Sequence, residues 1–124
     1  MSKQILGDEI LDRLASDVKQ FANDLLGLHP SSVFADAHAG SITVTMNDVL
    51  ADAERLGAKD RRVAELIVRN HTASFKAVSG ILHTHCAAVA RRPVESSSFF
   101  IDPESNCATI ILLFGNQSSN QHEC

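Results

Sequence analysis

The sequence predicts an α+β fold in two layers, with helices on one face of a four-stranded, largely antiparallel sheet. Three observations support this prediction: an amphipathic helical pattern opens the chain, two segments have the pattern of β-hairpins, and a long central helical pattern lies between them. The 124 residues have room for one hydrophobic core. We therefore expect one domain over residues 1–114 and a polar, disordered tail over residues 115–124.

The long N-terminal helix is expected over about residues 3–26. Its apolar residues recur at alternating steps of three and four, which is a heptad period. Gly27 and Pro30 end the helix. The stripe suits packing against the core, which is the interpretation that we favour. It could also pair with a second copy of the helix, but about two and a half heptads are few for a free coiled coil. Its residues are Leu11, Leu14, Val18, Phe21 and Leu25.

The first hairpin is expected over residues 32–47. Ala39 and Gly40 form its turn. After the turn, Ile42, Val44 and Met46 alternate with Ser and Thr, a period of two that gives a strand one buried face.

Two helices are expected between the hairpins. Asp48 is predicted to cap a short helix over residues 49–56. A long helix follows from Asp60, its N-cap, to residue 90. Gly80 inside this helix costs about 1 kcal/mol relative to Ala, so we expect it to mark a close helix approach or a slight bend.

The second hairpin is expected over residues 94–114. Its first strand covers residues 94–101, and the turn covers Asp102-Pro-Glu-Ser-Asn. The second strand, residues 107–114, is almost continuously apolar, which indicates a central position in the sheet.

Composition excludes several classes of function. The formal net charge is −4, and the chain has neither Trp nor Tyr, so we expect no nucleic-acid partner. The longest strongly apolar run, residues 108–114, is too short to span a bilayer, so we expect no direct membrane insertion. Three cysteines form no disulfide framework, and the acidic start is no signal peptide. We expect a cytoplasmic protein.

Histidine and cysteine residues near the end of the long helix suggest a metal site. His83 and Cys86 are three residues apart and could share one, whereas His85 points to another side of the helix. His122 and Cys124 could complete the site only through contacts that the sequence does not define. We expect no metal and no cofactor, and we keep His83 and Cys86 as the candidate ligands.

Catalysis is not indicated by the remaining reactive residues. No motif accompanies Cys86 as a nucleophile, and we expect His71 and His85 to be partly buried and hydrogen-bonded and His83 to be exposed. An apolar cleft enclosing His71 or His85 beside a carboxylate would favour an enzyme. The acids Asp48, Asp52 and Glu54 fit the first turns of a helix better than acid–base work.

Basic residues bracket the long helix. They could form an anion site, but a solvated face paired with Glu65 is the more common outcome. The residues are Arg55, Lys59, Arg61, Arg62, Arg69, Arg91 and Arg92.

Several short segments occur in an order that resembles the MpsC-like family. They are Gly27-Leu-His-Pro after the first helix, Ile42-Thr-Val, Ala53-Glu-Arg-Leu, Arg92-Pro-Val-Glu-Ser, and Asp102-Pro-Glu before the last strand. The resemblance covers about residues 5–114. The family tends to show Gly-Arg-Gly-Pro at the first segment, and Gly where this chain has Arg91.

The resemblance implies a connection with a system that generates membrane potential by sodium translocation, whose companion membrane proteins are linked to inorganic carbon uptake. It supplies no catalytic residues. We therefore expect a non-catalytic accessory or regulatory protein that binds a protein partner, such as the cytoplasmic face of a membrane transport complex. We also expect a homodimer, from the heptad stripe and the modest size. The alternative is a small ligand- or metal-sensing module that uses His83 and Cys86.

Overall fold

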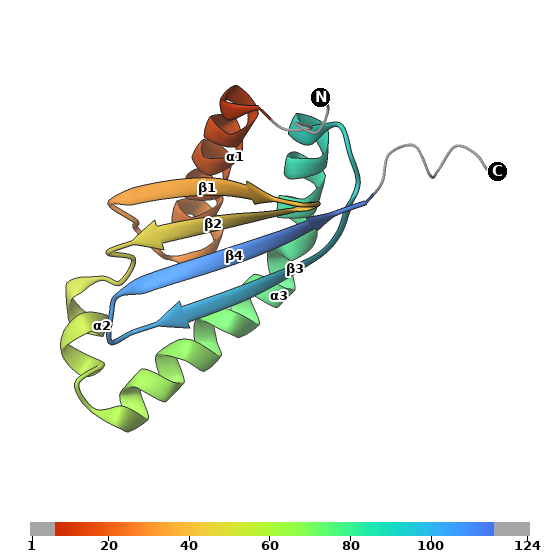
Figure 1. Cartoon of the computed structure of the whole chain (residues 1–124). Helices are drawn as coiled ribbons and strands as arrows, with labels where there is room; N and C mark the ends of the chain where they lie inside the picture. Colours follow the sequence, from red (N-terminus) through yellow and green to blue (C-terminus); the bar gives the residue numbers. More distant parts are fainter. Residues whose placement is uncertain (1–6, 116–124) are drawn as a thin grey trace.

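The computed structural model describes residues 7–115 of the chain. It confirms the predicted order of helices and hairpins (Figure 1). The elements are α1 (Asp8–Phe21), the π-helical turn η1 (Ala22–Leu26), β1 (Ser32–His38), β2 (Ser41–Asn47), α2 (Asp52–Gly57), α3 (Arg61–Ala90), β3 (Val94–Asp102) and β4 (Cys107–Phe114).

The two hairpins form one four-stranded antiparallel sheet in the order β1-β2-β4-β3. The second strands of the hairpins therefore lie side by side in the middle. This arrangement confirms the central position predicted for β4 from its continuous apolar sequence.

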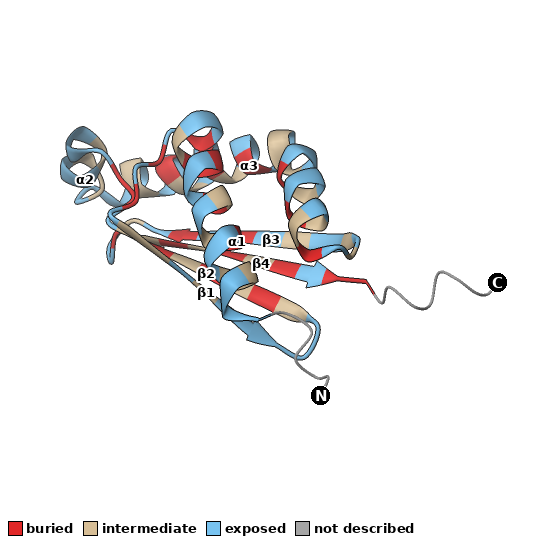
Figure 2. Cartoon of the chain, turned by 90° about the horizontal axis from the view of Figure 1, so that it is seen from above, coloured by how far each residue is buried: buried red, intermediate tan, exposed pale blue. Residues whose placement is uncertain are grey.

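The helices cover one face of the sheet, and no helix among residues 7–115 covers the other face (Figure 2). Buried side chains from β2, β3 and β4 meet those from α1 and α3 in a single core. Phe75 of α3 lies at its centre, edge-on to Phe21 with ring centroids 6.2 Å apart, and stacked on Phe99 with centroids 5.1 Å apart. The α+β two-layer fold is confirmed.

The heptad stripe of α1 packs into this core. Leu14, Val18 and Phe21 are buried, and the chain then leaves the helix through Gly27, whose φ of 68° suits glycine. Leu25 differs, because 40% of its surface is exposed. The predicted residues 3–6 of the helix lie outside the described residues.

The short helix begins three residues later than predicted, at Asp52 with Ala51 as its N-cap. The prediction that Asp48 caps it is wrong. Asp48 instead has a φ of 55° and accepts a hydrogen bond from the Ser31 hydroxyl at 2.7 Å. The sequence suggested a helix because Val49 and Leu50 follow directly, but both are buried in the connection that leads to α2.

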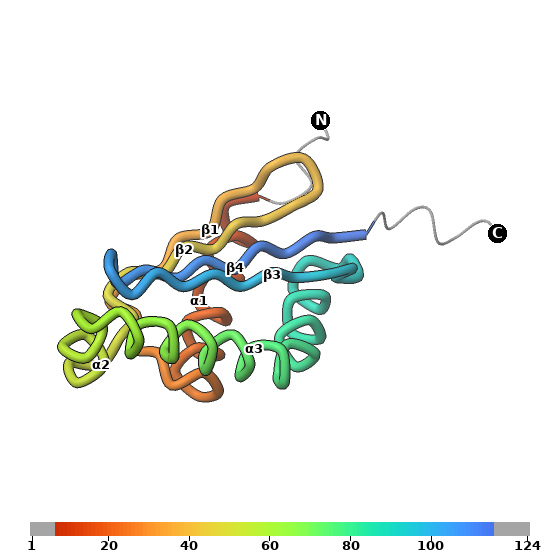
Figure 3. Tube along the Cα trace, turned by 90° about the horizontal axis from the view of Figure 1, so that it is seen from below, coloured from red at the N-terminus to blue at the C-terminus, as the bar shows by residue number. Residues whose placement is uncertain are grey.

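The long helix begins as predicted, with the Asp60 carboxylate accepting a hydrogen bond from the Arg62 backbone N–H at 2.8 Å. Its direction changes along its length (Figure 3). Gly80 and the Thr84 hydroxyl, which donates to the Gly80 carbonyl oxygen at 3.1 Å, lie in its second half and favour such a bend. The alternative of a close helix approach at Gly80 is wrong, because no atom lies within 4 Å of a Cβ placed there.

Gly115, the first residue of the predicted tail, packs against the fold. Gly115 is buried, and its backbone N–H donates to the Pro93 carbonyl oxygen at 2.7 Å. The rest of the predicted tail, residues 116–124, lies outside the described residues.

Candidate functional site

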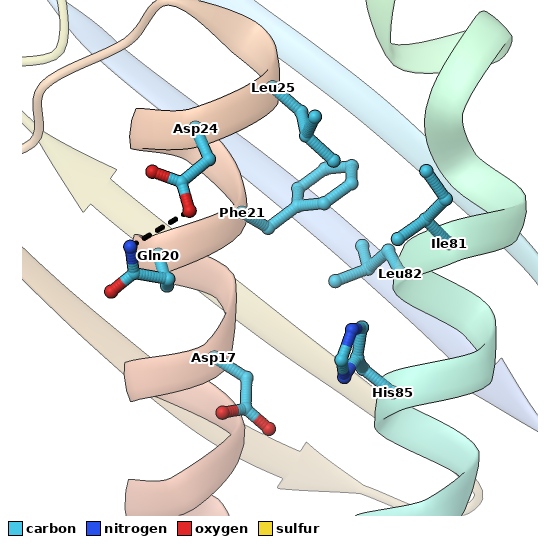
Figure 4. Close-up of a pocket in the computed structure, with 8 residues that line it drawn as sticks. All are labelled: Asp17, Gln20, Phe21, Asp24, Leu25, Ile81, Leu82 and His85. Carbon is cyan, nitrogen blue, oxygen red and sulfur yellow. Dashed lines mark hydrogen bonds between the residues drawn. The ribbon is translucent and has the colours of Figure 1, made fainter.

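A groove between the α1–η1 segment and α3 is a candidate site (Figure 4). Its cavity measures about 130 Å³. Buried Phe21 and Leu82 form the floor, while Leu25 and Ile81 stand at the rim with 40% and 48% of their surfaces exposed. We call this the α1–α3 groove. Its lining is Asp17, Gln20, Phe21, Asp24, Leu25, Ile81, Leu82 and His85.

The polar rim of the groove carries more acid than base. Asp17 and Asp24 come from the α1–η1 wall, and His85 comes from α3 opposite them (Figure 4). The Gln20 side-chain amide donates a hydrogen bond to the Asp24 carboxylate at 2.9 Å, and this contact lies on the exposed side of the wall. Within residues 7–115, no hydrogen bond joins His85 to either acid. An apolar groove with an acidic rim suits a segment that combines apolar and basic side chains.

His85 and His83 have exchanged the environments predicted for them. His85 is exposed, and His83 is half-buried with its Nε2 atom 2.7 Å from the Ser97 hydroxyl oxygen of β3. The helix turns by about 100° per residue, so the side facing the sheet is fixed by how α3 packs and not by local sequence. The prediction for these two residues was therefore wrong.

The predicted metal ligands do not converge. Cys86 is fully buried, and burial first and the negative charge of Asp17 second raise the pKa of its thiol to about 12. His83 is engaged by Ser97. In the described part of the chain, no three side chains of His, Cys, Asp or Glu gather as a metal site. His122 and Cys124 lie outside that part.

His71 is buried and hydrogen-bonded, as predicted. Its Nδ1 atom lies 3.1 Å from the Leu26 carbonyl oxygen, and its Nε2 atom lies 2.9 Å from the Glu54 carboxylate. The Leu26 carbonyl oxygen and the Glu54 carboxylate both accept hydrogen bonds. Both contacts are therefore hydrogen bonds only when the imidazole carries a proton on each nitrogen, or when the Glu54 carboxyl group itself carries a proton. His71 thereby connects α3 to η1 and to α2.

The acids grouped by sequence have separate structural roles. Asp52 and Glu54 lie in the first turn of α2, as predicted, and Glu54 also reaches His71. Asp48 contacts Ser31. The structure therefore separates Asp48 from the two acids of α2.

Three of the predicted basic residues line a second, larger cavity of about 640 Å³ between the α2–α3 connection and the β3–β4 turn. Arg55, Lys59 and Arg61 share it with the acids Asp102 and Glu104. Among residues 7–115, the predicted ion pairing with Glu65 is not found. Because acids line the cavity too, its charge is mixed.

Sequence reasoning missed the α1–α3 groove. Asp17 and His85 are distant in the chain, and only the side-by-side packing of two helices brings them to one rim. The exposed position Leu25 belongs to the stripe that we expected to pack against the core. Exposure of a stripe residue depends on helix orientation, which no periodicity reveals.

Within residues 7–115, no helix combines the length and apolar composition of a membrane span. No curated protein and no solved structure was found to match the chain. One family model matches residues 8–116, and its family is described as "Na+-translocating membrane potential-generating system (MpsC)". Because the match covers nearly the whole chain, the protein belongs to the MpsC family.

Proposed function

We propose that this protein is a non-catalytic accessory or regulatory subunit that binds a membrane transport system for cations or inorganic carbon. It acts in the cytoplasm, as a homodimer, by contact with a membrane protein and without entering the bilayer. Membership of the MpsC family supports the link to a sodium-dependent, potential-generating system.

The α1–α3 groove is the observation that carries the proposal. Leu25 and Ile81 offer apolar contacts, and Asp17 and Asp24 place negative charge around them. The cytoplasmic loops of membrane proteins carry an excess of Lys and Arg near the ends of their apolar spans. Such a segment matches the groove in both charge and apolarity.

A non-catalytic role is supported by the state of the reactive side chains. Cys86 is buried, with its pKa raised to about 12, so the reactive thiolate is scarce at neutral pH. Both ring nitrogens of His71 are engaged by hydrogen-bond acceptors. The α1–α3 groove does hold His85 beside carboxylates, the arrangement that would favour an enzyme, but His85 is exposed and lacks an orienting partner among the described residues.

The metal-sensing alternative has less support. A thiol binds metal as the thiolate, and the raised pKa of Cys86 disfavours that form. Elemental analysis of untagged protein distinguishes the two functions. We expect far less than one metal ion per chain, and a stoichiometric transition metal would favour the sensor.

Site-specific photo-cross-linking tests the proposed function. A photoreactive residue in place of Leu25 or Ile81 should cross-link in cells to a membrane protein, at a cytoplasmic segment rich in Lys and Arg. The double variant Asp17→Asn, Asp24→Asn should reduce the adduct about tenfold, because two charge contacts are removed.

The matched control is the double variant Glu65→Gln, Asp52→Asn, which removes two exposed acids away from the groove. It should leave the adduct unchanged. Adducts with soluble proteins alone, or equal losses in the two double variants, would contradict the proposal.

A further inference from the structure

The uncovered face of the sheet has no partner within the described residues. The helices pack against the opposite face (Figure 2). In β2 and β4, buried residues that face the helices alternate with more accessible residues on this side. Phe34 of β1 and Phe100 of β3 are 60% and 58% exposed here. We call this surface the open face. Phe34 and Phe100 are the two most exposed large apolar side chains of the strands, and Leu113 of β4 is 45% exposed on the same face.

One row of paired residues across the four strands of the open face has the same order of residue types from either edge of the sheet. Phe34 pairs with Thr45, Thr45 pairs with Thr109, and Thr109 pairs with Phe100. The row across β1, β2, β4 and β3 is therefore Phe-Thr-Thr-Phe. An interface between two identical chains with twofold symmetry requires a surface that complements itself.

We propose that a second copy of this chain packs its open face against this one, with Phe34 of each copy opposite Phe100 of the other. This inference rests on the homodimer of the proposed function and names its surface. A twofold axis parallel to the strands and between β2 and β4 produces the arrangement. This axis places β1 over β3 of the second copy. Each row of paired residues then lies opposite the same row of the second copy.

The charges on the open face fit this arrangement. Asp36 belongs to the row that ends at Ser98, and His38 to the row that ends at Ser96. Asp102 belongs to the row that ends at Ser32. In this arrangement Asp36, His38 and Asp102 each face a serine hydroxyl of the second copy, so no two of these three ionisable groups oppose each other. The hydroxyls can satisfy carboxylate and imidazole groups that lose water on association.

The available area fits a dimer of modest affinity. Four strands spaced about 4.8 Å apart, with seven residues rising about 3.3 Å each, give a flat area of roughly 440 Å² per copy. Two copies bury roughly 900 Å² before side-chain relief is added, near the minimum of about 1,000 Å² for a specific interface. We therefore expect a dimer that dissociates on dilution.

The α1 stripe cannot provide the dimer seam expected from the sequence. Leu14, Val18 and Phe21 are already buried in the core of their own chain, and no continuous seam is left for a second helix. The open face instead presents exposed apolar side chains on three of its strands, namely Phe34, Phe100 and Leu113.

Light scattering and cross-linking together test the inference. The wild-type protein should show the mass of two chains at high micromolar concentration. The variant Phe34→Thr, Phe100→Thr keeps residues that favour strands and should raise the dissociation constant about tenfold or more. The control variant Leu56→Ser, Leu66→Ser, which alters exposed apolar residues of α2 and α3, should leave it unchanged.

The two proposals fail in different ways. A wild-type mass of one chain overturns the homodimer and the surface together, while the binding of a membrane protein is tested separately by photo-cross-linking. A Phe34→Thr, Phe100→Thr variant that remains dimeric like the wild type overturns the open face alone.

The symmetry is tested by cysteine pairs in a background with Cys107→Ser and Cys124→Ser. A short bis-maleimide should join Asp36→Cys of one copy to Ser98→Cys of another, since facing sheets stack about 10 Å apart. Two copies that both carry Asp36→Cys should not be joined, because the axis places these positions on opposite sides of the interface. The reverse result, or no cross-link, overturns the arrangement.

Discussion

Arg91 adopts a conformation that side chains with a Cβ rarely occupy. It follows the last residue of α3 with φ of 59° and ψ of 37°, and its backbone N–H donates to the Ala87 carbonyl oxygen at 2.7 Å. This left-handed position closes many helices and usually holds glycine. The resemblance to the MpsC-like family implies glycine at this position, and the positive φ supplies the physical reason.

Replacing Arg91 with glycine should stabilise the fold. The change Arg91→Gly removes a left-handed strain of about 1 kcal/mol, partly offset by the greater freedom of glycine in the unfolded chain. Urea unfolding should therefore show a small rise in the free energy of unfolding. The control Ala88→Gly, at an exposed helical position of α3, should lower it by about 1 kcal/mol. A loss of stability in Arg91→Gly would contradict this account.

Cys86 links stability to alkaline pH. Its thiol has a pKa of about 12 in the fold against an ordinary value of 9.0, so the folded chain retains the proton that the unfolded chain loses. The stabilisation is complete below pH 9 and is lost as the pH rises toward 12.

The alkaline loss of stability should be smaller in Cys86→Ala than in the wild type. Unfolding measured at several pH values between 8 and 11 gives the comparison, and the free-energy difference in favour of the wild type should shrink above pH 9. The variant is expected to be less stable at neutral pH because it leaves a small cavity. Parallel curves for the two proteins would show that the thiol does not carry the effect.

At the scale of elements, the His71–Glu54 contact holds the short helix. Few contacts other than this fix α2, since none of its residues is buried. The 2.9 Å hydrogen bond attaches α2 to α3, and the 3.1 Å bond from the same ring attaches α3 to η1. The imidazole thus positions two separate segments at once.

Removing the Glu54 side chain should detach α2 and weaken the fold. For Glu54→Ala we expect a loss of about 1 kcal/mol, within the roughly 0.5–1.5 kcal/mol that a typical hydrogen bond contributes to stability. Asp52→Ala, an exposed acid in the same helical turn, should cost less than about 0.5 kcal/mol. Hydrogen exchange should show faster exchange confined to α2 in Glu54→Ala, and equal effects of the two variants would contradict a specific role for His71.

At the scale of the whole molecule, the two layers separate the two proposed interactions. The α1–α3 groove lies on the helical side, and the open face lies on the opposite side of the sheet (Figure 2). A dimer through the open face leaves both grooves accessible and directed away from each other. Each dimer then presents two acidic grooves, so linked contacts to a membrane assembly would strengthen binding through effective concentration.

The sequence by itself determined the secondary structure and the fold class. Alternation in residues 41–47 fixed which face of β2 is buried, and the continuous apolar sequence of β4 placed that strand centrally. Asp60 and Gly27 marked helix ends correctly because caps depend on neighbouring residues alone. The prediction that Asp48 caps a helix was wrong because Asp makes the same local hydrogen bonds at a helix cap and in a turn.

Only the tertiary structure decided which side chains meet. It buried the heptad stripe of α1, reversed the environments of His83 and His85, and brought Asp17 to the same groove as His85. It also aligned the Phe-Thr-Thr-Phe row across strands from two distant hairpins. Periodicity defines the faces of each element separately, whereas the rotation of a helix and the register between hairpins are set by packing across the whole core.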